Sequence, residues 1–291
     1  MHDKVILIYI FIVKIVTMKR MLLLMLMMSF CTHAQTQRFI YELQFKMDST
    51  KSQYEKLNFA LDINPKDVKY YEYAYLRSDS INKATGRYDH QYGSWFPSLK
   101  RERNSNKNQN YELIGHNMFS FPSEDKISWN LTSEVKKIGE NTLQKATTNF
   151  GGRSWVAWFN KDVNISEGPY KFRGLPGLIF QLEDSEANFI FTLIENKNLK
   201  KTYDTVGFVE TYYGTKPLEV SEKVRTKKKL DFYNDPLQDM RKDFKENMQG
   251  EMFVMGTKIT KAEQFNDLTK KLQEMLRKTN NPIERDKTMK Y

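Results

Sequence analysis

The side chains that could carry out catalysis or hold a metal ion are few and lie apart in the sequence. Beyond residue 34 the histidines are His90 and His116, which stand in different segments and not in a metal-binding spacing such as H-E-x-x-H. Glu183 and Asp184 are adjacent carboxylates, but neighbours on a strand point to opposite faces, and both are expected to be solvated at a strand end. We therefore predict no catalytic residue, no metal site and no cofactor.

Two arginines flank glycine-rich turns. Arg153 follows Gly151-Gly152, and Arg173 precedes Gly174. A guanidinium at such a place could clamp an anion, or it could hydrogen bond to nearby carbonyls and carboxylates. The sequence leaves both roles open.

The string GPYKFRGLPGLIFQLED, residues 168–184, is more typical of a structural turn than of an anion site. Phosphate-binding loops place their glycines before a helix, usually with a Lys followed by Ser or Thr, and neither feature occurs here. Pro176 and Gly177 suit the two central positions of a type II turn, since proline fixes φ and glycine accepts a positive φ. The predicted structural turn motif comprises Gly168, Pro169, Gly174, Leu175, Pro176, Gly177, Leu178 and Ile179.

Aromatic side chains are the remaining candidates for binding a ligand. The chain has 19 Phe, 16 Tyr and 4 Trp. Tyrosine and tryptophan on a sheet face can bind sugar rings, acyl chains or apolar partners, although each also suits core packing and cross-strand pairing. The candidate ligand face comprises Tyr71, Tyr73, Tyr75, Trp95 and Trp158.

Strands must position these residues. Apolar side chains alternate in residues 38–47 and 57–63, which predicts half-buried strands. Residues 69–77 also predict a strand, with tyrosines on both faces. We expect one of these faces to be partly exposed to solvent, or to be covered by another part of the molecule or by a partner. Gly151-Gly152 and residues 185–188 each separate two apolar runs and predict hairpins. The polar interval 78–110 predicts a long loop.

From about residue 217 the sequence period changes to that of helices. Asp235 could cap a helix with Pro236 at its first position, and Thr260 and Glu263 have capping-box spacing. An apolar stripe at helical spacing is expected to pack on the sheet: Phe265, Leu268, Leu272, Met275 and Leu276. The predicted fold class is α+β, mainly antiparallel β, with a twisted or half-barrel sheet followed by C-terminal helices.

The first 34 residues have the layout of a secretory signal peptide. Lys19 and Arg20 precede an apolar run, residues 21–30, and small residues lead to a cleavage site after Ala34. That run is too short to span a bilayer as a helix. Residues 1–17 are predicted to be a mis-assigned start. Cys31 is the only cysteine, so the mature chain, predicted as one domain over residues 35–291, has no disulfide or reactive thiol.

The net charge of +10 is spread among acids and bases. The densest basic run, Arg225 to Lys229, stands beside acidic residues without an aromatic ladder. We expect a solvated face there and no nucleic-acid partner, while contact with an acidic envelope surface stays open.

Residues 151–184 resemble the signature of the GLPGLI proteins, an uncharacterised exported family of Bacteroidetes type whose name corresponds to Gly174–Ile179. The resemblance extends upstream through residues 126–150 and reaches NNPIE at Asn280–Glu284. Many relatives have GY-x-C where this chain has GENTL, with Leu143 near the cysteine position. The resemblance implies an envelope protein without an assigned reaction. A similar module forms the front end of some bacterial peptide-N-glycanases, and the pattern is also similar to the half-barrel of periplasmic lipoprotein carriers.

Taken together, these features predict an exported, non-enzymatic binding or accessory protein of the cell envelope, periplasmic or associated with the outer membrane. Its partner would be an apolar or glycan ligand or an outer-membrane protein. Two alternatives remain open. One is an enzyme, or a non-catalytic module of one, that acts on glycoconjugates. The other is a structural scaffold for an outer-membrane partner.

Overall fold

The computed structural model describes residues 14–20, 36–86, 96–247, 252–279 and 281–289. Residues 14–20 are helical, and the rest of the predicted signal peptide lies outside the described residues. Within the described part of the chain, no helix combines the length and the apolar character that a membrane crossing needs.

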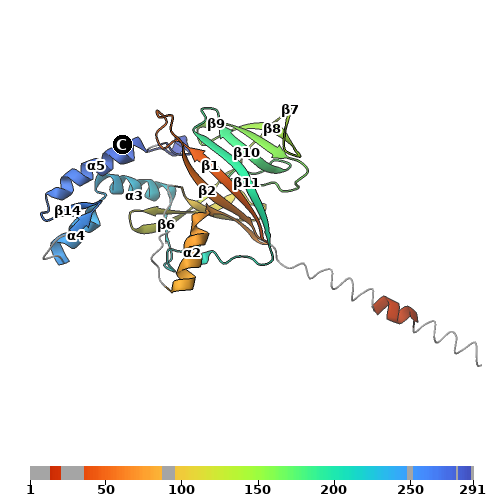
Figure 1. Ribbon diagram of the computed structural model, residues 1–291, viewed down its shortest axis with the longest axis horizontal. Coiled ribbons are helices and arrows are strands. Elements are labelled where there is room, and N and C mark those ends of the chain that lie inside the picture. Colours follow the sequence, from red (N-terminus) through yellow and green to blue (C-terminus); the bar gives the residue numbers. More distant parts are fainter. Residues whose placement is uncertain (1–13, 21–35, 87–95, 248–251, 280, 290–291) are drawn as a thin grey trace, which may run out of the picture.

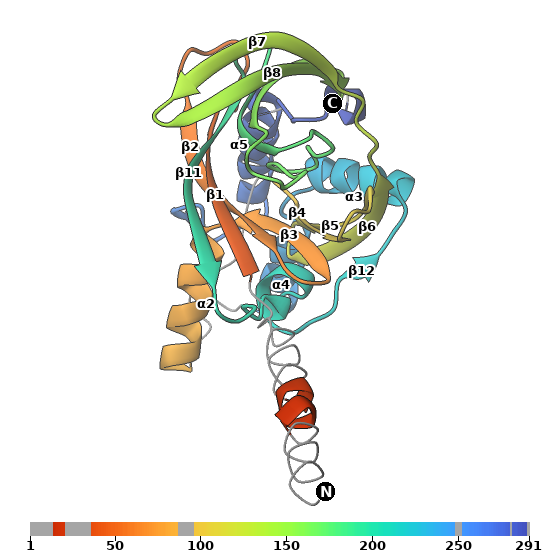
Figure 2. The same cartoon turned by 90° about the vertical axis from the view of Figure 1, so that its right-hand side faces the viewer.

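The structure is built on one twelve-stranded sheet in the order β12-β6-β5-β4-β3-β2-β1-β11-β10-β9-β8-β7. All neighbouring strands are antiparallel except β12, which pairs in parallel with β6. The sheet curves without closing, so that β7 and β8 arch over the side opposite β5 and β6 (Figure 2). The strands are β1 Thr36–Phe45, β2 Glu55–Ile63, β3 Asp67–Glu72, β4 Ser98–Glu102, β5 Lys107–Ile114, β6 Asn117–Glu124, β7 Asn130–Ile138, β8 Asn141–Phe150, β9 Arg153–Asn160, β10 Leu178–Asp184, β11 Phe189–Leu199 and β12 Leu218–Glu219.

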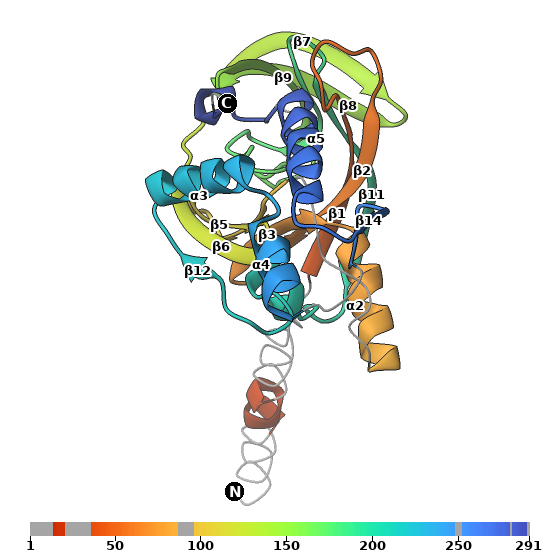
Figure 3. The same ribbon diagram turned by 90° about the vertical axis from the view of Figure 1, so that its left-hand side faces the viewer.

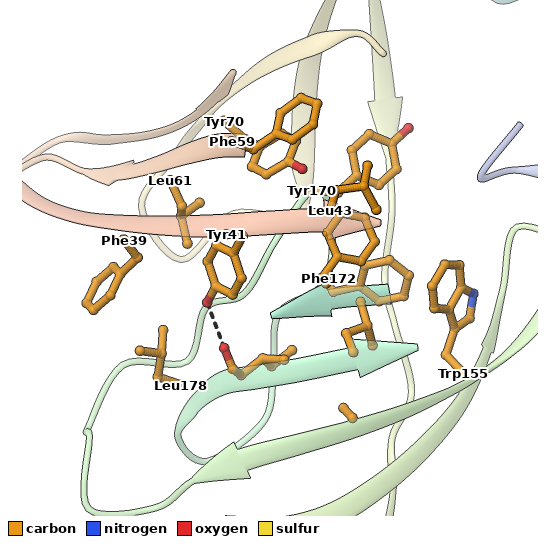
Figure 4. Close-up of a cluster of buried hydrophobic side chains, with 14 of the residues drawn as sticks. Phe39, Tyr41, Leu43, Phe59, Leu61, Tyr70, Trp155, Tyr170, Phe172 and Leu178 are labelled. Carbon is orange, nitrogen blue, oxygen red and sulfur yellow. Dashed lines mark hydrogen bonds between the residues drawn. The ribbon is translucent and has the colours of Figure 1, made fainter. Parts of the chain in front are cut away.

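The main core lies on the concave face of this sheet. The alternation in β1 sends Phe39, Tyr41 and Leu43 into it, and the partner strand β2 contributes Phe59 and Leu61. These side chains are at most 5% exposed. Figure 4 shows them facing side chains from the second half of the chain, and the Tyr41 hydroxyl donates a hydrogen bond to the carbonyl of Ile179 at 2.7 Å.

Both predicted hairpins are confirmed. Gly151 and Gly152 connect β8 to β9 with φ angles of 63° and 72°, which glycine adopts without the strain that a side chain adds. Residues 185–188 connect β10 to β11, where the amide of Ala187 donates to the carbonyl of Asp184 at 2.9 Å.

The convex face is covered by a helix that the alternating pattern did not reveal. Strand β3 ends at Glu72 and helix α2, Ala74–Thr85, begins two residues later, so the prediction of a strand over residues 69–77 is wrong in its second half. Helix α2 and the π-helical turn η1, Val206–Glu210, enclose a second apolar cluster around Tyr71 and Phe208. The loop predicted over residues 78–110 is also wrong, since β4 and part of β5 lie there.

The C-terminal part is helical, as predicted. It contains α3 Glu222–Asn234, α4 Gln238–Asn247, the hairpin of β13 Met252–Val254 and β14 Thr257–Ile259, α5 Gln264–Lys278 and the short helix η2 Arg285–Lys287. Helices α3, α4 and α5 group on one side of the sheet (Figures 1 and 3), and α3 contacts β5, β6 and α5. Together with the mainly antiparallel sheet, they confirm the predicted fold class of an antiparallel sheet followed by helices.

Details of these helices differ from the sequence-based expectations. Ser221 caps helix α3, and its hydroxyl accepts a hydrogen bond from the amide of Val224. Helix α4 begins at Gln238, so the prediction of a helix capped by Asp235 with Pro236 at its first position is wrong, and Asp235 instead follows the end of α3. The predicted cap at Thr260 is wrong, because Glu263 precedes α5 without a side-chain cap and Gln264 accepts from the Thr260 amide at 2.7 Å.

The apolar stripe of α5 does not pack on the large sheet as expected. Phe265 and Leu268 are buried in a separate small cluster with Leu237 before α4 and with Val254 and Ile259 of the β13–β14 hairpin. The apolar side of α5 is therefore buried by the β13–β14 hairpin and by the segment of α4, and not by the large sheet as expected.

Candidate functional site

The loop between β9 and β10, residues 161–177, fills much of the concave face. Its side chains Tyr170, Phe172 and Leu175 are at most 4% exposed and belong to the main core. The ring of Phe172 packs 4.7 Å from that of Trp155, centroid to centroid (Figure 4). The glycine-rich string is therefore an internal part of the core.

Two of the three glycines of this loop, Gly168 and Gly177, are required by close approach. A Cβ on Gly177 would lie 2.1 Å from the carbonyl oxygen of Asn160, and one on Gly168 would lie 2.8 Å from the carbonyl oxygen of Phe172. The geometry is not the predicted type II turn, because φ of Gly177 is 157° and the Leu178 amide donates to Val163. The segment is structural, and Gly177 is required by its tight packing against the end of β9.

Charged side chains of the same loop reach the opposite wall of the half-barrel. Glu167 pairs with Arg101 of β4, and Arg173 donates to the side chain of Asn106 at 2.7 Å. The Lys171 ammonium lies 3.2 Å from a carboxylate oxygen of Asp125, and its side chain is 1% exposed. The loop thus ties β9 and β10 to β4 and to the ends of β5 and β6.

Residues 281–289, here called the C-terminal strap, run back over the β8–β9 hairpin. The amide of Arg285 donates to the carbonyl of Gly151 at 2.6 Å, and a Cβ on Gly151 would lie 2.9 Å from Cα of Glu284. Gly151 is therefore needed both for its positive φ and for this contact.

Arg153 holds the strap to the sheet. Its guanidinium pairs with Asp184 at 2.8 Å and donates to the Pro282 carbonyl at 2.7 Å and to the Asn281 side chain at 2.6 Å. Of the two roles left open for Arg153, local hydrogen bonding is the one observed. Asp184 is buried, not solvated, because it also accepts from the amides of Asn188 and Phe189, whereas Glu183 is exposed.

A cavity of about 300 Å³ remains between the sheet, the loop, helix α3, the end of α5 and the strap. Its apolar wall combines aromatic and aliphatic side chains. The side chains of this wall come from segments far apart in the sequence: Phe45, Met47, Phe96, Pro97, Leu113, Ile114, Phe121, Tyr170, Phe232, Tyr233, Leu276, Pro282, Ile283 and Met289.

Two carboxylates at the cavity each join a pair of cations. Glu112 of β5 contacts Arg225 at 2.6 Å and Lys229 at 2.5 Å, both on α3. Glu284 of the strap contacts Lys171 at 2.7 Å and also Lys287, and it accepts from the Tyr170 hydroxyl at 2.6 Å. These contacts connect the strap to the loop and α3 to the sheet.

The electrostatics of Glu284 follow from these contacts. Burial by itself would raise the pKa of its carboxyl, but the charge of Lys171 and hydrogen bonds from Lys171, Lys287 and Tyr170 outweigh burial and lower the pKa to about 2. For Glu112, burial is likewise outweighed by Lys229 and Arg225, and its pKa is lowered. Both groups are therefore ionised in their ion pairs at neutral pH.

We expect Glu284 to make the fold sensitive to acid. Its pKa is lowered in the folded state from 4.5 to about 2, so its stabilisation is complete above pH 4.5 and is lost as the pH falls towards 2. The full contribution is on the order of 3 kcal/mol. Urea unfolding of the wild type and of Glu284→Gln at pH 7, 4 and 2.5 measures it, and the stability difference between the two proteins should shrink with the pH. An unchanged difference would contradict this assignment.

The structure brings three residues of the candidate ligand face together, Tyr71, Tyr73 and Tyr75, and places Trp158 elsewhere. Tyr71 and Tyr75 are at most 7% exposed in the second apolar cluster, and Tyr73 packs against that cluster. The second tyrosine face of this segment is therefore covered, by α2 and η1. Trp158 lies far along the sheet on β9, with the Lys136 ammonium 4.2 Å from its ring centroid. Trp95 lies outside the described residues.

Metal chemistry finds no support within the described residues, where no group of three or more His, Cys, Asp or Glu side chains is placed to hold an ion. His116 is exposed in the turn between β5 and β6, and His90 lies outside the described residues.

Sequence reasoning missed the cavity because its lining comes from several distant segments. One local signal was present in the basic run that was predicted as a solvated face. Arg225, Lys229 and Phe232 recur at spacings of four and three, which places them on one side of a helix, and all three line the cavity. Lys227, on another side of α3, is 71% exposed and does fit the predicted solvated face.

One family of known sequences matches a short part of the chain. The family described as "Protein of unknown function (Porph_ging)" matches residues 151–181, which hold β9, the loop and the start of β10. No curated protein matches the chain.

Among solved structures, two crystal forms of PNGF-II, in space groups C2 and P21, are similar at 15% and 16% identity, each with a TM-score of 0.48. The matches cover 68% and 67% of this chain. Each match spans only 33% of the length of PNGF-II.

Proposed function

We propose that this protein is an exported, non-enzymatic binding protein of the bacterial cell envelope and that it holds a small ligand in the cavity beneath the C-terminal strap. The observation that carries the proposal is the cavity of about 300 Å³, whose wall is mainly aromatic and aliphatic. Ligand pockets are usually concave, mostly apolar and at least of this size. The signal-peptide layout of residues 1–34 supports the export part of the proposal.

Binding fits the polar groups of the cavity better than catalysis does. Glu112 and Glu284 are each engaged by two cations, and their pKa values are lowered. A general acid needs the opposite shift, towards neutral pH. The carboxylate pair singled out in the sequence is also divided, because Asp184 is buried against Arg153 while Glu183 is exposed. These features favour a carrier or accessory protein over an enzyme that acts on glycoconjugates.

Native mass spectrometry tests the proposal directly. The full chain is expressed with export, purified gently from the envelope and measured beside two variants of adjacent residues on α5. Leu276→Trp fills the cavity, since Leu276 lines it, whereas Met275→Trp adds the same bulk at a side chain that is 39% exposed and outside the lining. We expect a discrete extra mass on the wild type and on Met275→Trp, and none on Leu276→Trp.

The identity of that mass decides between the two ligand classes left open by the sequence, apolar molecules and glycans. A bare mass for all three proteins would overturn the proposal and favour a scaffold that packs against an outer-membrane partner. An extra mass retained by Leu276→Trp would place the ligand elsewhere on the molecule.

A further inference from the structure

The charges that line the cavity are unequal in number. The lining contains four cations and two carboxylates: Lys171, Arg225, Lys229 and Lys287, with Glu112 and Glu284. The distribution of their partners decides whether this excess is available to a ligand.

The two inner cations are each matched by two carboxylates. Arg225 contacts Glu112 and, on its own helix, Glu222, each at 2.6 Å. Lys171 contacts Glu284 at 2.7 Å and Asp125 at 3.2 Å. Since both inner side chains are also at most 12% exposed, their charge is already compensated inside the protein.

The two outer cations have less compensation. The structure gives Lys229 one carboxylate contact, to Glu112, and gives Lys287 one, to Glu284, and each of these carboxylates is shared with an inner cation. The side chains of Lys229 and Lys287 are 30% and 34% exposed. An ammonium group has three donors, so both lysines retain donors for an anion.

The remaining wall is suited to an apolar body. Phe45, Phe96, Phe121 and Phe232 offer ring faces and edges without hydrogen-bonding groups, and Leu276 and Ile283 are aliphatic. A sugar ring would leave most of its hydroxyls without partners against such a surface, at a cost in free energy for each. A cationic ligand would meet the excess of positive charge.

We propose that the ligand of this cavity is a small amphiphile with one acidic head group, a carboxylate or a phosphate, which Lys229 and Lys287 bind while its apolar body lies against the phenylalanines. A cavity of about 300 Å³ has room for an apolar chain of about ten carbon atoms, with the head group at the partly exposed Lys229 and Lys287. This inference rests on the proposed function and adds the chemical class of the ligand to it.

Calorimetric titration of the full chain with three probes of equal chain length tests the head group. Decanoate and decyl phosphate carry an acidic head group, and 1-decanol is their neutral counterpart. We expect both anions to bind at least tenfold more tightly than decanol, and raising the salt concentration to weaken the anions alone. The tighter anion identifies the head group.

Lysine variants assign the contact. Lys229→Gln and Lys287→Gln are each expected to weaken the anions about tenfold, which corresponds to about 1.4 kcal/mol, and to leave decanol within about twofold. Lys227→Gln is the matched control, because Lys227 lies on the same helix, pairs with Asp231 and is 71% exposed. Its affinities should equal those of the wild type, and thermal melts of all three variants check that the fold is retained.

Equal binding of the anions and decanol, unaffected by either lysine variant, would overturn the acidic head group and leave the proposed binding function standing. Failure of all three probes to bind would also overturn the inference. The native mass measurement with Leu276→Trp would then decide separately whether the cavity binds any other ligand.

Discussion

Replacing Gly177 by alanine is expected to lower the free energy of unfolding by about 3–5 kcal/mol, one of the largest effects available to a single methyl group in this fold. The new Cβ would lie 2.1 Å from the carbonyl oxygen of Asn160 and 2.7 Å from the carbonyl carbon. Both atoms belong to the backbone at the end of β9, so no side chain can rotate away. Relief would require β9 and β10 to separate where Leu178 pairs with Asn160.

Thermal and urea unfolding measure this effect, with Gly207→Ala as the control. Gly207 lies in η1, and a Cβ there would meet no atom within 4 Å. We expect the control to unfold within about 0.5 kcal/mol of the wild type. If Gly177→Ala were equally stable, the close approach of residue 177 to β9 would be disproved.

Replacing Lys171 by methionine is expected to cost about 3–5 kcal/mol, because it leaves two buried carboxylates without their shared cation. Lys171 is 1% exposed and lies within 3.2 Å of both Asp125 and Glu284. Methionine has a similar shape, so the loss is mainly electrostatic. The pKa of Glu284 should rise as well, since burial raises it and Lys171 is the largest opposing influence.

A double variant distinguishes this loss of charge from a loss of packing. Adding Glu284→Gln to Lys171→Met removes one of the two carboxylates that shared Lys171 and should restore part of the stability, which a double-mutant cycle measures. Lys161→Met is the control, since Lys161 is an exposed residue of the same loop. A double variant with the summed losses of its two single variants would contradict the proposed coupling.

The parts of the fold that could be predicted are those with a local cause. Gly151-Gly152 can form a two-residue turn with two positive φ angles, and the alternation in β1 and β2 reports directly on a half-buried strand. The change of period near residue 217 also marks a local preference, so the helical C-terminal part was predictable even though its helix bounds were not.

Strand β4 and the first half of β5 were missed because most of their buried residues are polar. Arg101, Asn108 and Asn110 are at most 4% exposed, although a polar stretch of this kind predicts a loop. Residues further along the chain help to stabilise them in the interior: Glu167 pairs with Arg101, and the Asp125 carboxylate accepts a hydrogen bond from Asn108. A binding partner that is remote in the sequence does not change the pattern of apolar and polar residues within the strand, so that pattern cannot reveal it.

Helix α2 was missed for a related reason. The tyrosines of residues 70–75 continue a strand-like pattern past the end of β3, whereas in the structure Tyr75 of α2 packs against Phe208 of η1, which is remote in the sequence. The same holds for the cavity, whose lining comes from β1, β5, β6, the loop, α3, α5 and the strap. Such a site exists only after the chain has folded.

The pairing of β1 with β11 has a consequence for the order in which the protein folds. Thr36 is paired with Leu199 and Phe45 with Phe189. Strand β1 can therefore form this pairing only after β11, in the second half of the chain, is available. The contact of Arg285 with Gly151 needs almost the whole chain. Contacts between residues so distant in sequence slow folding, because loop closure costs entropy before the pairing compensates for it. We therefore expect the pairing of β1 to be completed only after β11 is available, and the contact of the strap only after residue 285 is available.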